Sequence, residues 1–148
     1  MRQFFSLLCF FLFLSPLTAQ PEVLSGTWRG TLTQDDGGFA PSFDFGLELE
    51  VKTSYIDGYS FVSVGDIGGE MDLIAYWNEA TQSIDVREEK IRKSVKPTSL
   101  EWCYKTMRLR LTYTGGGKFM LEGPWEGVSA AGVCIPGYVR LYKSVPRA

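Results

Sequence analysis

Histidine is absent from the 148 residues of this chain. Histidine is the usual general base of enzymes and the commonest metal ligand, so its absence excludes Ser-His-Asp and Cys-His catalytic groups and zinc sites built on imidazole. The nearest approach to an acid–base pair is Glu48 with Glu50, but strand alternation alone explains two carboxylates on one face. The acidic turn that begins at Asp35 lacks the ligand spacing of an EF-hand. We therefore expect no enzymatic activity, no cofactor and no metal site.

The sequence also lacks an apolar run long enough to cross a bilayer as a helix. Its longest run, Phe4 to Leu14, covers about eleven residues, whereas a membrane helix needs roughly twenty. The basic Arg2 precedes this run and Leu17-Thr18-Ala19 follows it, which is the pattern of a secretory signal peptide. We predict a cleaved signal peptide over residues 1–19 and one mature domain over 20–148 without a membrane span. The location implied is periplasmic or extracellular.

Cysteine is scarce, and no two cysteines have the C-x-x-C spacing of redox or metal sites. One of the three, Cys9, lies in the predicted signal peptide, which leaves Cys103 and Cys134. An even count in an exported chain predicts a disulfide, and closing a loop of about thirty residues contributes roughly 3 to 4 kcal/mol in the chain-entropy model.

Neither sign of charge is in large excess, since the formal net charge is −2. Nucleic acid and anionic membranes are therefore not expected partners.

Helical periodicity is missing, and apolar residues alternate with polar ones instead. The clearest segment is 43–52, where Phe45 and Leu47 share one face while Glu48 and Glu50 share the other. The charged second face argues against an outer-membrane barrel, which presents an apolar band to lipid. Eight segments are predicted as strands: 27–33, 43–52, 59–64, 71–77, 83–90, 102–114, 119–125 and 138–143.

Two similar pentapeptides lie near the two ends of the predicted domain. Each places a tryptophan between two glycines, and glycine within a strand marks a bulge, a corner or a close backbone approach. We interpret the two segments as corners of one closed sheet, with Trp28 and Trp125 facing a shared interior. The predicted fold is all-β, an eight-stranded antiparallel up-and-down β-barrel. The flanking glycines, with a structural role, are Gly26, Gly30, Gly123 and Gly127.

The alternation fails in the segment 83–90. Inward positions at Ile84 and Val86 predict that Glu88 also faces inward, yet Ile91 is apolar on the opposite parity, so we predict a bulge near Glu88. Two interpretations of this glutamate remain open: a solvated residue at a strand end, or a buried carboxylate that orients a ligand. Lys105, on an otherwise apolar strand face, either extends to the rim or pairs with an inward glutamate.

The segment Leu24-Ser25-Gly26-Thr27-Trp28, followed by eight predicted strands, resembles the start of the calycins, the group of lipocalins and avidins. The resemblance implies an eight-stranded meander barrel that holds a small, mainly apolar molecule in its lumen. It also implies that a cation on the last strand, Arg140 here, covers the ring of Trp28.

Two functions are compatible with these features. The first is an exported, soluble binding protein for a small, mainly apolar ligand, although the same rings are also expected in a filled, ligand-free barrel. The second is a protein-interaction module or inhibitor that uses outward aromatic residues, for which Tyr76, Trp102 and Tyr104 are candidates. The candidate ligand-binding residues are Trp28, Tyr59, Trp77, Glu88, Tyr113, Phe119 and Trp125.

Overall fold

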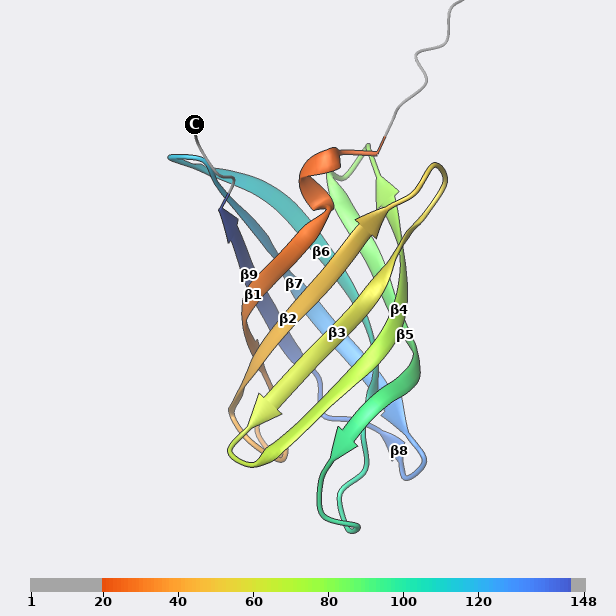
Figure 1. Cartoon of the computed structure of the whole chain (residues 1–148). Helices are drawn as coiled ribbons and strands as arrows, with labels where there is room; N and C mark the ends of the chain where they lie inside the picture. The colour runs from red at the N-terminus through yellow and green to blue at the C-terminus, as the bar shows by residue number, and fades with distance from the viewer. Residues whose placement is uncertain (1–19, 145–148) are drawn as a thin grey trace, which may run out of the picture.

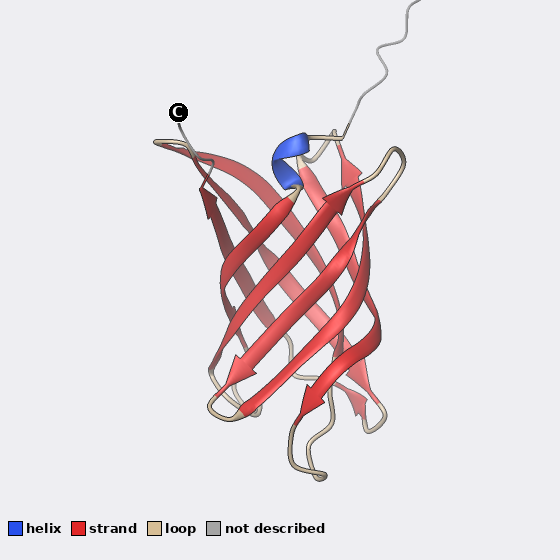
Figure 2. Cartoon of the chain, viewed as in Figure 1, coloured by secondary structure: helices blue, strands red, loops and turns tan. Residues whose placement is uncertain are grey.

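The computed structural model describes residues 20–144. The predicted signal peptide, 1–19, and the segment 145–148 lie outside the described residues. Figures 1 and 2 show an all-β structure with a single short 3-10 turn among these residues. Its elements are η1 (Glu22–Leu24), β1 (Gly26–Thr33), β2 (Ser42–Val51), β3 (Ile56–Val64), β4 (Ile67–Asn78), β5 (Ser83–Val95), β6 (Tyr104–Gly115), β7 (Lys118–Ser129), β8 (Gly132–Val133) and β9 (Gly137–Ser144).

The strands form a closed antiparallel barrel. Strands β1 to β7 pair with their neighbours in chain order, and β9 lies between β7 and β1, which completes an eight-stranded wall (Figure 1). The short β8 pairs only with the end of β7. The predicted fold and number of barrel strands are therefore confirmed, and closure leaves most strand edges paired.

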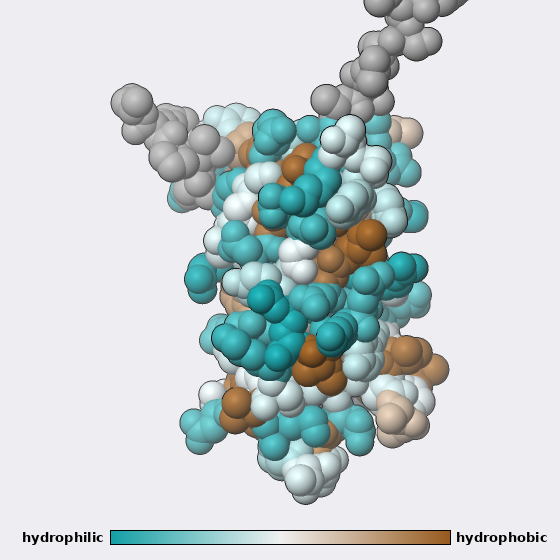
Figure 3. Space-filling model, turned by 45° about the vertical axis from the view of Figure 1, so that its right-hand side comes forward, coloured by the Kyte–Doolittle hydropathy of each residue, from teal (hydrophilic) through white to brown (hydrophobic). Residues whose placement is uncertain are grey.

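Alternating side chains fill most of the barrel interior. In β2, for example, Phe45, Leu47 and Leu49 are buried while Glu50 is exposed. Trp28 of β1 is fully buried, and its indole Nε1 donates a 2.9 Å hydrogen bond to the Leu24 carbonyl. The outer surface in Figure 3 is mainly hydrophilic, with separate apolar patches. No helix within residues 20–144 is long and apolar enough to cross a membrane.

The glycine-flanked tryptophans lie where neighbouring strands approach closely. A Cβ atom on Gly30 would lie 2.0 Å from the Arg140 carbonyl oxygen, and one on Gly123 would lie 1.8 Å from that of Arg108. Both distances are far below van der Waals contact, so only glycine fits without a backbone shift. Of the three features that such glycines indicate, the structure shows a close backbone approach at Gly30 and Gly123.

Two register shifts occur in the pairing of β4 with β5. Glu88 pairs with Leu73 and Lys90 with Asp72, so Glu89 has no partner in β4. A second shift follows, and Arg92 therefore also has no backbone pairing partner in β4. The predicted bulge next to Glu88 is confirmed, and it restores the parity that brings Ile91 against the core.

Strand β5 separates from β6 after its first half. Its pairing with β6 ends at Arg87, opposite Thr106, although β5 itself continues to Val95. The connecting segment then returns to β6, and a disulfide joins Cys103 to Cys134, whose Cα atoms are 6.2 Å apart. The predicted cysteine pairing is thus seen in the structure.

Candidate functional site

A small cavity lies at one end of the barrel, which we call the cavity end. The β1–β2, β3–β4 and β5–β6 connections and β8 lie at this end, and η1 lies at the other (Figure 1). The cavity has a volume of about 70 Å³, which is room for about two water molecules at roughly 30 Å³ each. Its walls are largely apolar and include Leu32, Phe43, Val62, Ile67, Trp102 and Trp125.

Trp102 forms one wall of the cavity from the segment just before β6. Its side chain lies against Gly69 of β4, where an added Cβ would be 2.9 Å from the indole ring, and its Nε1 donates a 2.8 Å hydrogen bond to Ser94 Oγ. The residue is only 9% exposed. Its predicted outward orientation is wrong, because β6 begins at Tyr104 and strand alternation does not extend back to Trp102.

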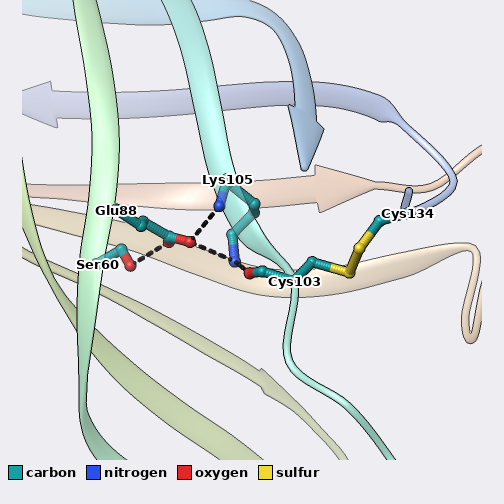
Figure 4. A network of polar contacts seen from close by, with 5 residues as sticks. All are labelled: Ser60, Glu88, Cys103, Lys105 and Cys134. Carbon is teal, nitrogen blue, oxygen red and sulfur yellow. Dashed lines mark hydrogen bonds and ion pairs between the residues drawn. A yellow bond between two sulfur atoms is a disulfide. The ribbon is translucent and has the colours of Figure 1, made fainter. Parts of the chain in front are cut away.

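A buried polar network lies beside the cavity (Figure 4). Glu88 Oε2 is 2.9 Å from Lys105 Nζ and accepts a 2.8 Å hydrogen bond from the Lys105 backbone N–H. The other carboxylate oxygen accepts a hydrogen bond from Ser60 Oγ. Lys105 Nζ also donates to the Cys103 carbonyl, at 3.1 Å. The network joins β3, β5 and β6 inside the barrel.

The two charged side chains differ in their access to the cavity. The Glu88 side chain is 0% exposed, whereas the Lys105 side chain is 5% exposed and contributes to the cavity wall. The structure therefore places Glu88 inside the barrel, and the solvated position applies instead to Glu89, which pairs with Arg87 on the surface. For Lys105, pairing with an inward glutamate is confirmed.

Of the six predicted ring residues, the structure brings one to the cavity. Trp125 lines it, with its Nε1 donating a 2.8 Å hydrogen bond to the Thr33 carbonyl. Trp28 is inside the barrel but packed on all sides. Trp77 is half-buried near the opposite end, where its Nε1 donates to Glu79.

The other three rings lie away from the cavity. Tyr59 is on the outer face of β3, where the Arg92 guanidinium lies 4.1 Å from its ring centroid. Its predicted place in the lumen is wrong, because the neighbouring Ser60 occupies the inward position. Tyr113 and Phe119 contact each other across the β6–β7 hairpin, with ring centroids 4.9 Å apart. They lie near the hairpin tip, and Tyr113 is 57% exposed.

The cation over Trp28 is Lys143 and not the expected Arg140. Lys143 Nζ lies 5.7 Å from the Trp28 ring and donates to the carbonyls of Val23 and Ser25. Arg140 is on the outer face, where its Nε donates a 2.8 Å hydrogen bond to Glu122. The physical reason is parity, because β9 turns its odd-numbered residues inward.

Burial and hydrogen bonding change the acidity of several surface and rim groups. Burial lowers the pKa of Lys143, against a smaller opposing effect of Glu48. The hydrogen bond from Arg140 to Glu122, together with their charge attraction, raises the pKa of Arg140. Neither group reaches the cavity, so its chemistry is set by Lys105 and the apolar walls.

The remaining cavity residues were missed by sequence reasoning. Phe43 and Val62 have the inward parity of their strands, a signal that was available in the sequence. Trp102 and Leu100 belong to a connection, for which no periodic signal exists. Within residues 20–144, no group of three or more acidic or cysteine side chains is placed to hold a metal.

The chain was compared with family models, with curated proteins and with solved structures. No family model, no curated protein and no solved structure matches it.

Proposed function

We propose that this protein is an exported binding protein that holds a small, mainly apolar molecule in the cavity at the end of its barrel. The observation that carries the proposal is an apolar cavity whose lining includes Lys105, a residue with its ammonium group buried in an ion pair with Glu88. Buried ion pairs are weak contributors to stability, and apolar replacements of similar volume are often as stable or more so. A barrel selected for stability alone has little need of such a pair, whereas binding sites combine apolar walls with few polar groups.

The cavity size limits the ligand. A volume of about 70 Å³ accommodates about two to three non-hydrogen atoms if each occupies the roughly 30 Å³ of one water. The rest of a larger molecule would lie outside, against Phe39 and Leu100 at the rim. Calycin barrels hold their ligand deeper in the lumen, but here Trp28 and Phe45 already fill that region. The resemblance to calycins therefore supports the barrel architecture, and the ligand that we propose lies nearer the mouth than in that group.

Export is supported by the disulfide. Disulfides persist in oxidising compartments such as the periplasm and the extracellular space, and Cys103 is bonded to Cys134 here. A secreted or periplasmic location therefore forms part of the proposal.

The test is native mass spectrometry of the protein isolated from its own host, followed by a denatured measurement. A non-covalent adduct that is lost on denaturation is the expected result. In the variant Val64→Phe, which fills the cavity from β3, the adduct should disappear. The matched control Val95→Phe places the same ring at a position that is 65% exposed and outside the cavity, and it should keep the adduct. A bare mass, or an adduct unaffected by Val64→Phe, contradicts the proposal.

A second candidate function is protein binding, favoured by the apolar side chains around the cavity end. Several residues on the connections and strand ends at this end are exposed, and Val133 is the extreme case at 87%. Exposed apolar clusters are typical of interaction sites. Chemical cross-linking in the exported fraction of the host, with wild type and Val133→Asp, tests this function. A cross-linked species that the variant loses supports it, and the absence of any such species removes it. The exposed residues are Phe39, Val95, Val128, Val133 and Ile135.

A further inference from the structure

We infer that the cavity selects an uncharged ligand with a hydrogen-bond acceptor, such as the carbonyl of a ketone, ester or amide, and that Lys105 donates to this acceptor. The inference rests on the proposed function and specifies the ligand class of the same site. It is argued from the hydrogen-bond donors and acceptors of Lys105 and Glu88 that are not already used within the fold.

Lys105 has one more donor than the network uses. A lysine ammonium carries three N–H groups. One is directed to Glu88 Oε2 at 2.9 Å and one to the Cys103 carbonyl at 3.1 Å. Among residues 20–144, Lys105 Nζ has no third oxygen partner, and it lies 5.8 Å from the centroid of the Phe45 ring. Because Lys105 is also a lining residue of the cavity, we assign this third N–H to an acceptor on the ligand.

The cavity offers no comparable acceptor to a ligand cation. Glu88 is fully buried and does not line the cavity, and both of its oxygens already accept hydrogen bonds. Gln34 uses both of its amide atoms within the fold, by donating to the Ile135 carbonyl and accepting from the Phe39 N–H. Glu101 and Ser63 are exposed at the rim. An amine placed in the cavity would face the like charge of Lys105 instead.

An anionic ligand is disfavoured by the charge already present. Glu88 and Lys105 form a neutral pair, so a carboxylate ligand would add a second negative charge beside a single ammonium. Burying a charge without its own counter-charge is costly. A neutral carbonyl has a smaller desolvation cost and receives a charge-assisted hydrogen bond, which is stronger than one between neutral groups.

The experiment compares four probes with the same five-carbon chain: pentan-2-one, pentanoate, pentylamine and pentane. Binding to the mature protein is followed by the fluorescence of Trp102 and Trp125, which line the cavity. Pentan-2-one should bind about tenfold or more tightly than each of the other probes, the ratio expected for one hydrogen bond to a charged group. Probes that bind without preference for the ketone overturn this inference alone. The absence of binding by every probe overturns both the inference and the proposed function.

A variant isolates the role of Lys105. The single change Lys105→Met would leave the Glu88 carboxylate buried without its partner, so the double variant Glu88→Gln/Lys105→Met is used, which removes both charges while the glutamine oxygen keeps an acceptor for the Lys105 backbone N–H. This variant should bind pentan-2-one and pentane with equal affinity. The control Lys93→Met removes an exposed lysine of β5 and should keep the ketone preference. A ketone preference that survives in the double variant overturns the role given to Lys105.

Discussion

Two lysines place an ammonium against the barrel core, at opposite ends and in different surroundings. Lys105 is paired with the Glu88 carboxylate next to the cavity. Lys143 has no carboxylate within ion-pair distance among the described residues, and it donates instead to the carbonyls of Val23 and Ser25 while covering Trp28. Because neutral carbonyls compensate less than a carboxylate for lost hydration, burial lowers the pKa of Lys143. Lys143 thus ties η1 to β9 and closes the end opposite the cavity.

The lowered pKa of Lys143 predicts a specific pH dependence. In the unfolded chain this residue has the ordinary pKa of 10.5, so between the lowered value and 10.5 the unfolded state binds more protons than the folded state. Stability then rises with pH across this window, as the folded protein is relieved of an unfavourable charge, and below the window the destabilising effect of this charge is constant with pH. The free energy of unfolding should be measured in urea from pH 7 upward for wild type and Lys143→Met. The free energy of unfolding of wild type should increase relative to that of Lys143→Met as pH rises. A difference between the two proteins that is constant with pH would contradict the lowered pKa of Lys143.

At the scale of elements, β5 changes its partners halfway along its length. Its first half pairs with both β4 and β6, and its second half pairs with β4 alone. At the point of separation the backbone N–H of Lys105 donates to the Glu88 side chain. The Glu88 carboxylate therefore continues the wall where the hydrogen-bond ladder stops. A neutral glutamine would accept the same backbone hydrogen bond, so this role does not by itself account for the buried ammonium.

Close approach between strands leaves no room for a side chain at Gly123 of β7. The change Gly123→Ala places a methyl group against the Arg108 carbonyl of β6, and we expect it to lower the free energy of unfolding by about 1 to 3 kcal/mol, as overpacked sites do. Gly68→Ala in β4 is the matched control, because its nearest non-adjacent atom would be 3.6 Å away. The control should be neutral or slightly stabilising. Equal unfolding midpoints in urea for the two variants would show that the barrel relaxes freely at Gly123.

Strand number, antiparallel closure and the inward position of Glu88 were predictable because alternating burial is a local property of β-strands. The same rule, applied strictly to β3 and β9, also places Tyr59 and Arg140 on the outside, so those two errors came from neglected parity. Trp102 was different, since its orientation depends on how a connection packs against Gly69. The position of the cavity was not predictable for the same reason. It depends on the combined packing of connections that carry no periodic signal.

At the scale of the whole molecule, the disulfide holds the cavity end together. It joins the residue just before β6 to the segment between β8 and β9, and the two cysteines are 31 positions apart in sequence. Cys103 also lines the cavity, and its carbonyl accepts a hydrogen bond from Lys105. The bond therefore stabilises both the fold and the position of the buried ammonium.

Removing the disulfide should cost about 3 to 4 kcal/mol of unfolding free energy in the chain-entropy model. The variant Cys103→Ser/Cys134→Ser, compared with wild type by urea denaturation under oxidising conditions, measures this loss. Wild type under a reducing agent should fall toward the variant, which provides an independent check. Coincident transitions for wild type and variant without reductant would mean that the bond does not form in solution.

The separation of β5 from β6 also bears on how copies of this chain behave when crowded together. Unpaired strand edges are the usual starting points of aggregation, because another chain can extend the sheet there. The second half of β5 has such an edge, and it carries Lys90, Arg92 and Lys93. Arg92 and Lys93 pair with Asp72 and Glu70 of β4, so two copies that approach through this edge would have to desolvate these charged side chains, which disfavours the contact. The half of β5 that lacks a β6 partner is thus protected against sheet growth between molecules.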